Sequence, residues 1–119
     1  MSDKIIIAPK LEKQDLSKIV KYQENSIVSK ELIKKDTGSV SIFAFAEGEE
    51  LVDSTVPFET FIHILDGKTQ VNIGENSFEL EQGETIIIPA DITHSFVAVK
   101  PFKMMIIMIK ELEKEGKKE

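Results

Sequence analysis

The residues of this chain that could do chemistry are few, because it contains two histidines, His63 and His94, and no cysteine. The absence of cysteine excludes disulfides, thiolate nucleophiles and metal centres built on cysteine. Two imidazoles also exclude a three-histidine metal site within one chain. A histidine assisted by a carboxylate can still transfer protons near neutral pH or help to hold a metal. The chemistry therefore depends on what the fold places around these two side chains.

Composition and charge narrow the possible partners. Of the 119 residues, 41% are hydrophobic and 30% are charged, which is typical of one soluble globular domain. The 15 Lys and Arg against 21 Asp and Glu give a formal net charge of −6, so a nucleic-acid backbone would be repelled. The apolar runs 5–8 and 104–109 are too short for a membrane-spanning helix or a secretory signal. We therefore expect a cytoplasmic protein with no nucleic-acid or membrane partner.

Short strands are predicted from Ser26 onward, and residues 39–45 alternate apolar and polar side chains as a half-buried strand does. Further strand-like runs follow at residues 58–65, 69–73, 77–80, 85–88, 94–99 and 103–109. Before them, Asp15 can cap a short helix. The apolar positions of that helix are Leu16, Ile19 and Val20.

Turn signals separate these runs, and the first of them, Asp66-Gly67, suits a tight hairpin. The others are Gly74-Glu75-Asn76, Gln82-Gly83 and Pro89-Ala90-Asp91. Many short strands at this spacing favour an antiparallel sandwich or barrel. We expect an all-β domain over residues 26–110, preceded by a segment with a short helix (residues 1–25) and followed by a charged tail (residues 111–119).

Two linked patterns lie between residues 48 and 96. Glu59 and Gly67 belong to the first, and Gly83, Pro89 and His94 belong to the second. Over residues 39–109 the chain resembles the cupin superfamily, whose motifs run G-x5-H-x-H-x3–4-E-x6-G and G-x5-P-x-G-x2-H. The second motif matches at its stated spacing, whereas Glu59 and Gly67 have seven residues between them rather than six. The resemblance implies a jelly-roll barrel, or double-stranded β-helix, of the small cupin-2-like type.

The departures from the family pattern concern the metal ligands that the resemblance implies. The two histidine positions of the first motif fall on Asp53 and Thr55 or on Val52 and Ser54, depending on register, and Asp91 replaces the glycine of the second motif. Of three histidines and one glutamate, only His94 and Glu59 remain, with Asp53 as a candidate third ligand. No cofactor is firmly expected, and a divalent metal on this set would be weakly bound.

Strand alternation predicts which side chains line the barrel. If Glu59 points inward, Phe61 and His63 do so too, since side chains two apart share a face. By the same parity Phe96 accompanies His94. The expected ligand-binding residues are apolar walls with a few polar points, namely Phe45, Glu59, Phe61, His63, His94 and Phe96. The aromatic side chains could instead simply fill a narrow barrel.

Three functions remain open, and the first is binding of a small molecule in a barrel with weak or no metal affinity. The second is a metal-dependent enzyme of the dioxygenase or isomerase type, using Glu59, His94 and a non-standard third ligand. The third is a metal-free, isomerase-like enzyme with His94 as base and Glu59 as its partner. We also expect a homodimer that buries part of residues 27–45, because open sheet edges invite pairing.

Overall fold

The computed structural model describes residues 5–7 and 10–111, the first three of them by their backbone alone. Within these ranges the regular elements are strands. They are β1 (Ile5–Ile7), β2 (Ile27–Lys35), β3 (Gly38–Phe45), β4 (Glu50–Ser54), β5 (Phe58–Asp66), β6 (Lys68–Ile73), β7 (Asn76–Glu81), β8 (Thr85–Ile88), β9 (His94–Ala98) and β10 (Phe102–Lys110).

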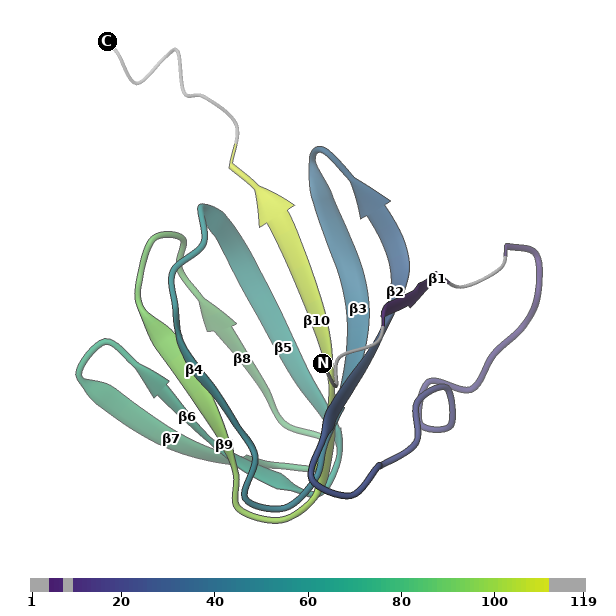
Figure 1. Cartoon of the computed structure of the whole chain (residues 1–119). Coiled ribbons are helices and arrows are strands. Elements are labelled where there is room, and N and C mark those ends of the chain that lie inside the picture. Colours follow the sequence, from purple (N-terminus) through teal and green to yellow (C-terminus); the bar gives the residue numbers. More distant parts are fainter. Residues whose placement is uncertain (1–4, 8–9, 112–119) are drawn as a thin grey trace, which may run out of the picture.

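The strands form two sheets that face each other (Figure 1). One has six strands in the order β1-β2-β3-β10-β5-β8, and the other has four in the order β4-β9-β6-β7. Neighbouring strands are antiparallel, except that β1 runs parallel to β2. The sheets converge at one end and diverge at the other, so the sandwich has a closed and an open end. This is the all-β architecture that the strand spacing predicted.

The strand predictions are confirmed for every run from residue 39 onward. Residues 85–88 form β8 with the predicted bounds, and the other predicted runs differ from the observed strands by one residue at one end or at both. The alternation of apolar and polar residues predicts these strands because the sandwich buries one face of most strands and leaves the other partly exposed to solvent. Side chains therefore alternate with a period of two along the sequence. β4 was not predicted as a strand, because its residues were assigned only to the first motif.

The short helix predicted after Asp15 is wrong. The backbone N–H groups of Lys18 and Ile19 both donate to the Asp15 carbonyl, at 2.9 and 3.1 Å, and the chain makes one turn there without continuing as a helix. So few residues do not sustain a helix in water. The apolar side chains instead pack against the six-stranded sheet. Within the described residues no helix is long and apolar enough to cross a membrane.

The hairpin predicted at Asp66-Gly67 is also wrong, because β5 and β6 belong to different sheets. The turn carries the chain across the closed end of the sandwich. Gly67 has φ +79°, and a Cβ there would collide with the Pro101 carbonyl, so the close approach of these two turns requires glycine. The next turn signal does close a hairpin, in which Ile73 of β6 lies opposite Asn76 of β7.

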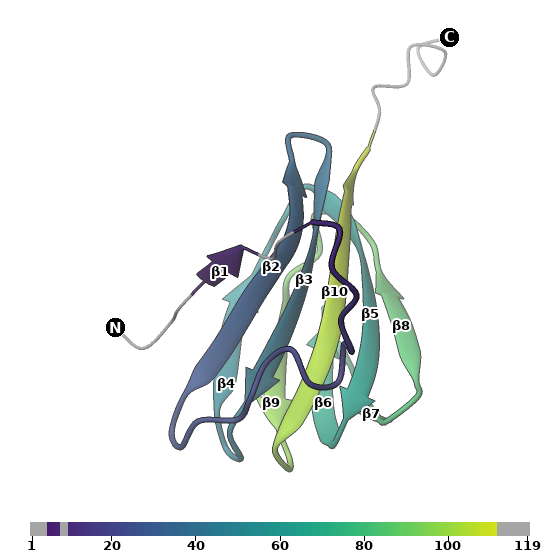
Figure 2. The same ribbon diagram turned by 90° about the vertical axis from the view of Figure 1, so that its right-hand side faces the viewer.

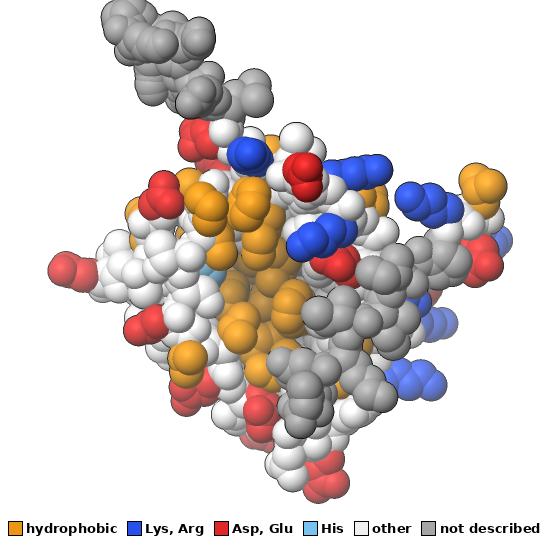
Figure 3. Space-filling model, turned by 45° about the horizontal axis from the view of Figure 1, so that its top comes forward, with side chains coloured by type: hydrophobic (Ala, Val, Ile, Leu, Met, Phe, Trp, Pro, Cys, Tyr) orange, Lys and Arg blue, Asp and Glu red, His pale blue; other side chains and the backbone are white. Residues whose placement is uncertain are grey.

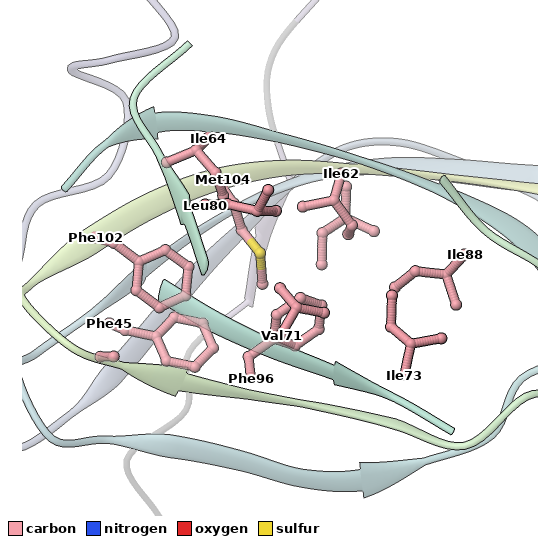
Figure 4. Packing of buried hydrophobic residues seen from close by; sticks show 12 residues of the cluster. Phe45, Ile62, Ile64, Val71, Ile73, Leu80, Ile88, Phe96, Phe102 and Met104 are labelled. Atoms are coloured by element: carbon pink, nitrogen blue, oxygen red, sulfur yellow. The ribbon is translucent and has the colours of Figure 1, made fainter. Parts of the chain in front are cut away.

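The main hydrophobic core lies between the sheets and includes the closed end. Phe45 of β3 and Phe102 of β10 stack there with ring centroids 4.5 Å apart, and both are fully buried. Phe96 enters from the facing sheet, and Met104 lies above the stacked rings (Figure 4). At this end aromatic and aliphatic side chains fill the interior, as the filled-barrel interpretation expected.

A second, smaller cluster lies on the outer face of the six-stranded sheet. Val28, Ile42 and Ala44 are buried there beneath side chains from residues 16–22. Figure 2 shows the segment before β2 crossing in front of this sheet while leaving β5 and β8 uncovered. Lys103 holds the segment by donating from Nζ to the Ser17 carbonyl at 2.8 Å.

Candidate functional site

His94 is the histidine that faces the space between the sheets. It begins β9, where it lies opposite Ile73 of β6 and Ser54 of β4, and its side chain is only 6% exposed. Ala98, at the other end of β9, adjoins the turn into β10 at the closed end. Four residues of strand therefore place His94 about 13 Å nearer the open end. The prediction that His94 and Phe96 both point inward is confirmed, and their rings meet edge to face with centroids 5.7 Å apart.

The imidazole of His94 has one partnered and one available nitrogen. Nδ1 lies 3.1 Å from the Ile92 carbonyl oxygen, which only accepts, so Nδ1 carries the proton and Nε2 of the neutral ring presents its lone pair. Every fully buried side-chain nitrogen or oxygen among the described residues has a hydrogen-bond partner. Nε2 has none within that part of the chain, so it must be reached by solvent. The fold thus holds this imidazole acceptor toward the open end of the core.

Apolar side chains pack partly buried around the main core, which contains Phe96, the edge-to-face neighbour of His94. These side chains are Ile27, Phe43, Leu51, Ile86, Ile92 and Met108. Figure 3 views the molecule with its open end brought forward and shows a hollow among hydrophobic side chains between the sheets. An apolar concavity with few polar groups is the usual composition of a small-molecule site.

A groove of about 430 Å³ adjoins His94 on one side of the sandwich. It lies between β7 and β8, which are edge strands of the two sheets, and Phe78, Ile86 and Pro89 contribute to its walls. It also includes Ile73, the cross-strand neighbour of His94, and Ile92, whose carbonyl accepts the Nδ1 proton. The volume falls within the range of about 300–1,000 Å³ that is common for ligand pockets.

The predicted inward orientation of Glu59, Phe61 and His63 is wrong. The buried side chains of β5 alternate with these three, and they are Thr60, Ile62 and Ile64. Glu59 and His63 therefore lie on the outer face, where His63 Nδ1 is 2.8 Å from Thr85 Oγ1. A shift of one residue in the assumed register reverses every side chain of a strand. The structure thus splits the expected ligand-binding set, with Phe45, His94 and Phe96 inside and Glu59, Phe61 and His63 outside.

The motif positions fall on other residues than those first chosen. Six intervening residues before Gly67 place the family glutamate position at Thr60, which is buried and faces inward. Five intervening residues after Gly48 place the two histidine positions at Ser54 and Val56. Ser54 agrees with this register, because it lies directly opposite His94. The sequence itself contained this alignment of the first motif, because counting from Gly48 and counting from Gly67 place its ligand positions in the same register.

The residues at these positions do not fit the metal that the resemblance implies. The hydroxyls of Ser54 and Thr60 are neutral, and each donates to a backbone carbonyl at 3.3 Å. Asp53 is exposed and Glu59 lies on the far side of its sheet, so neither joins His94. The described residues contain no group of three or more His, Cys, Asp or Glu that could hold a metal ion. One imidazole between two hydroxyls is a poor site for a transition metal.

Asp91 keeps the backbone conformation that the motif glycine would have. It has φ +63°, and its N–H donates to the Val56 carbonyl at 2.8 Å. Aspartate tolerates this left-handed conformation better than most residues. The loop before β9 therefore contacts the connection between β4 and β5 and leads into His94 although the motif glycine is absent.

Two facing sheets in this strand order, closed at one end with an inward histidine at the other, define a jelly-roll protein of the cupin class. The sequence pattern of the cupin domain matches residues 41–110, and the chain belongs to this family. No curated protein matches it.

Solved structures share the fold. A conserved protein of unknown function from Streptococcus pyogenes superposes with a TM-score of 0.84 at 24% identity, over 89% of this chain and 93% of that one. A cupin superfamily protein from Desulfitobacterium hafniense gives 0.81 at 24% identity, over 87% and 94%. A cupin 2 conserved barrel domain protein from Leptotrichia buccalis gives 0.77 at 33% identity, over 79% of this chain but 46% of that protein. These likenesses establish the fold and leave the ligand open.

Proposed function

We propose that this chain binds a small, mostly apolar molecule in the hollow at its open end, without a metal. The observation that supports this most directly is His94, whose available Nε2 is the acceptor at a site with apolar walls. Its Nδ1 proton is fixed by the Ile92 carbonyl, so the orientation of the ring is set before a ligand arrives. Such preorganisation lowers the entropic cost of binding.

The contacts point to the chemistry of the ligand. A lone pair at Nε2 pairs with an O–H or N–H donor, while the surrounding walls favour an aromatic or aliphatic body. A site that desolvates its acceptor disfavours an analogue without the donor, because the acceptor then loses its partner. An alcohol or phenol should therefore bind better than the corresponding ether.

Phenol and its methyl ether, anisole, test this directly. Each is titrated into the full chain carrying labelled methyl groups, and binding is followed by NMR at Ile86, Ile92 and Met108. Phenol should shift these resonances, and anisole should bind about tenfold more weakly, as expected for the loss of one hydrogen bond from a desolvated acceptor.

The two histidines provide a matched control. His94→Ala should abolish the preference for phenol, whereas His63→Ala should retain it, because His63 lies on the outer face. Equal affinity for the two compounds, or a preference that survives His94→Ala, would contradict the proposal. So would about one equivalent of a transition metal in protein purified without metal-affinity resin, since structural sites retain their ions.

A further inference from the structure

β7 is an edge strand of the four-stranded sheet, and within the described residues it pairs with β6 alone (Figure 1). In an antiparallel pair, alternate residues direct their backbone N–H and C=O groups toward the partner strand and away from it. Those of Glu81 point away from β6, because its N–H donates to Glu84 Oε1 at 2.9 Å and its carbonyl accepts from the Glu84 N–H at 3.0 Å. By the same alternation, the backbone groups of Ser77 and Glu79 also point away from β6. No hydrogen bond within the described part of the chain uses them, so this edge offers donors and acceptors to another strand.

An apolar groove lies beside this open edge. It is the groove of about 430 Å³ between β7 and β8, and Phe78 and Ile86 contribute to its walls. Phe78 lies opposite the buried Val71 of β6, on the face of β7 that looks toward the core. It is nevertheless 41% exposed. Unpaired backbone groups next to an uncovered apolar side chain are the combination that accepts an additional strand.

The opposite face of β7 is acidic. Glu79 and Glu81 alternate with Phe78 and Leu80 along the strand, and both carboxylates are exposed. β7 contains no lysine or arginine, and the cation near it is Lys68 of β6, whose Nζ lies 3.6 Å from Glu79 Oε1. Two copies of β7 paired edge to edge would bring their acidic side chains together, which disfavours self-pairing. A strand with basic side chains on this face would be favoured instead.

We propose that β7 binds an extended peptide of another protein as an additional antiparallel strand, and that this peptide alternates apolar and basic residues. Its apolar side chains enter the groove beside Phe78, and its basic side chains face Glu79 and Glu81. The peptide residue directly opposite Glu79 exchanges both backbone hydrogen bonds with it, and its side chain lies on the acidic face. The backbone hydrogen bonds to β7 therefore come from the basic residues of the peptide, whereas the N–H groups of its apolar residues point away. This inference does not depend on the ligand proposed for the hollow.

A capped peptide of alternating lysine and valine, acetyl-KVKVKVK-amide, tests this when it is titrated into the full chain. The amide resonances of Ser77 and Glu79 should shift in NMR spectra, and their hydrogen exchange should slow. The acidic peptide acetyl-EVEVEVE-amide should bind at least about tenfold more weakly at low salt. Unchanged Ser77 and Glu79 amides, or equal affinity for the two peptides, would overturn the proposal.

Methylation of the peptide backbone tests the hydrogen-bond pattern without altering charge. The lysine-valine peptide N-methylated on its lysines should lose binding, because those amides donate to β7. The same peptide N-methylated on its valines should bind within about threefold of the unmodified one. Equal binding by the two methylated peptides would rule out this strand arrangement.

Variants of the chain test the two faces of β7 separately. Phe78→Ser should weaken binding of the lysine-valine peptide about tenfold, because the valines lose an apolar wall. Val99→Ser is the matched control, since Val99 is 37% exposed in the turn between β9 and β10. Glu79→Lys/Glu81→Lys should reverse the preference in favour of the acidic peptide. Equal effects of the two serine variants, or an unchanged charge preference, would contradict the proposal. Because all four side chains are exposed, the variants should keep their circular dichroism.

Discussion

At the residue scale, Tyr22 and Asp66 join the segment before β2 to the end of β5. Tyr22 Oη donates to Asp66 Oδ2 at 2.6 Å. Burial disfavours the phenolate, and Asp66 disfavours it further by accepting the proton and by its negative charge, so the pKa of Tyr22 lies well above its ordinary value. Since the folded pKa is the higher one, the group stabilises the fold below the ordinary tyrosine pKa. This contribution is lost as the pH rises toward the folded value.

Tyr22→Phe should lower the free energy of unfolding at pH 7 by about 1–2 kcal/mol, as for a hydrogen bond to a charged acceptor. The difference from the unaltered protein should shrink as the pH rises above about 10, where the unfolded tyrosine ionises. Urea unfolding at several pH values measures it. Tyr22 is the only tyrosine, so phenolate absorption reports its titration without interference. A difference that stays constant with pH would show that the hydrogen bond is not formed.

Glu59 and Thr60 show how far the sequence could predict the site. The motif identified His94 and the inward direction of β9, because the spacing of Gly83, Pro89 and His94 matches the family. Choosing Glu59 by residue type rather than Thr60 by spacing moved the site to the wrong face of β5. A carboxylate attracts attention as a ligand, but the pleat of the strand decides where it points.

Restoring ligands at the corrected positions tests this register. Ser54→His together with Thr60→Glu should create, with His94, a three-ligand site that binds cobalt and gives its tetrahedral absorption spectrum. Ser54→His alone, which leaves Glu59 as the nearest candidate carboxylate in sequence, should bind cobalt at least about tenfold more weakly. If the single variant bound equally well, Glu59 would have to reach the interior.

At the scale of elements, strands were predictable and their partners were not. Periodicity reports whether one face of a segment is buried, but the Asp66-Gly67 turn looks the same in a hairpin and in a crossing between sheets. The helix prediction failed for a related reason. Leu16, Ile19 and Val20 do form an apolar face, but they bury it on the sheet without helical hydrogen bonds beyond the first turn.

Alanine substitutions at two glycines distinguish the cost of a left-handed backbone from the cost of a steric clash in these turns. Gly67 and Gly48 have φ +79° and +84°, but a Cβ at Gly67 would collide with Pro101 and Phe102, whereas nothing lies near one at Gly48. Gly48→Ala should lower the free energy of unfolding by about 1 kcal/mol, the usual penalty for an alanine in the left-handed conformation. Gly67→Ala should lower the free energy of unfolding by at least about 3 kcal/mol or prevent folding. If urea unfolding showed the same loss of unfolding free energy for both variants, the turn at Gly67 would have to move away from Pro101.

At the scale of the whole molecule, β10 is the element on which the six-stranded sheet depends. It lies between β3 and β5, and along most of its length it pairs with both. Its inward side chains Phe102, Met104 and Ile106 belong to the main core. Opening β10 therefore requires both neighbours to separate.

Native-state hydrogen exchange should show this order. The amide protons of β10 should exchange at least about a hundredfold more slowly than those of β7 and β8, because edge strands open locally and central strands open with the whole domain. Hydrogen exchange measured by NMR at several low denaturant concentrations distinguishes amides that exchange by local opening from amides that exchange only when the whole domain unfolds. Protection of β8 equal to that of β10 would contradict this order of opening.

The stacked rings of Phe45 and Phe102, both on the six-stranded sheet, lie at the closed end of the core that also contains Phe96 of the facing sheet, and β9 runs from that end toward His94. When β9 rotates slightly as a rigid strand about the closed end, each of its residues moves in proportion to its distance from that end. Ala98 barely shifts while His94, about 13 Å farther along the strand, travels most. We therefore expect the width of the open end to vary more readily than that of the packed end, so that ligands of different size can enter while the aromatic contacts of the core stay intact.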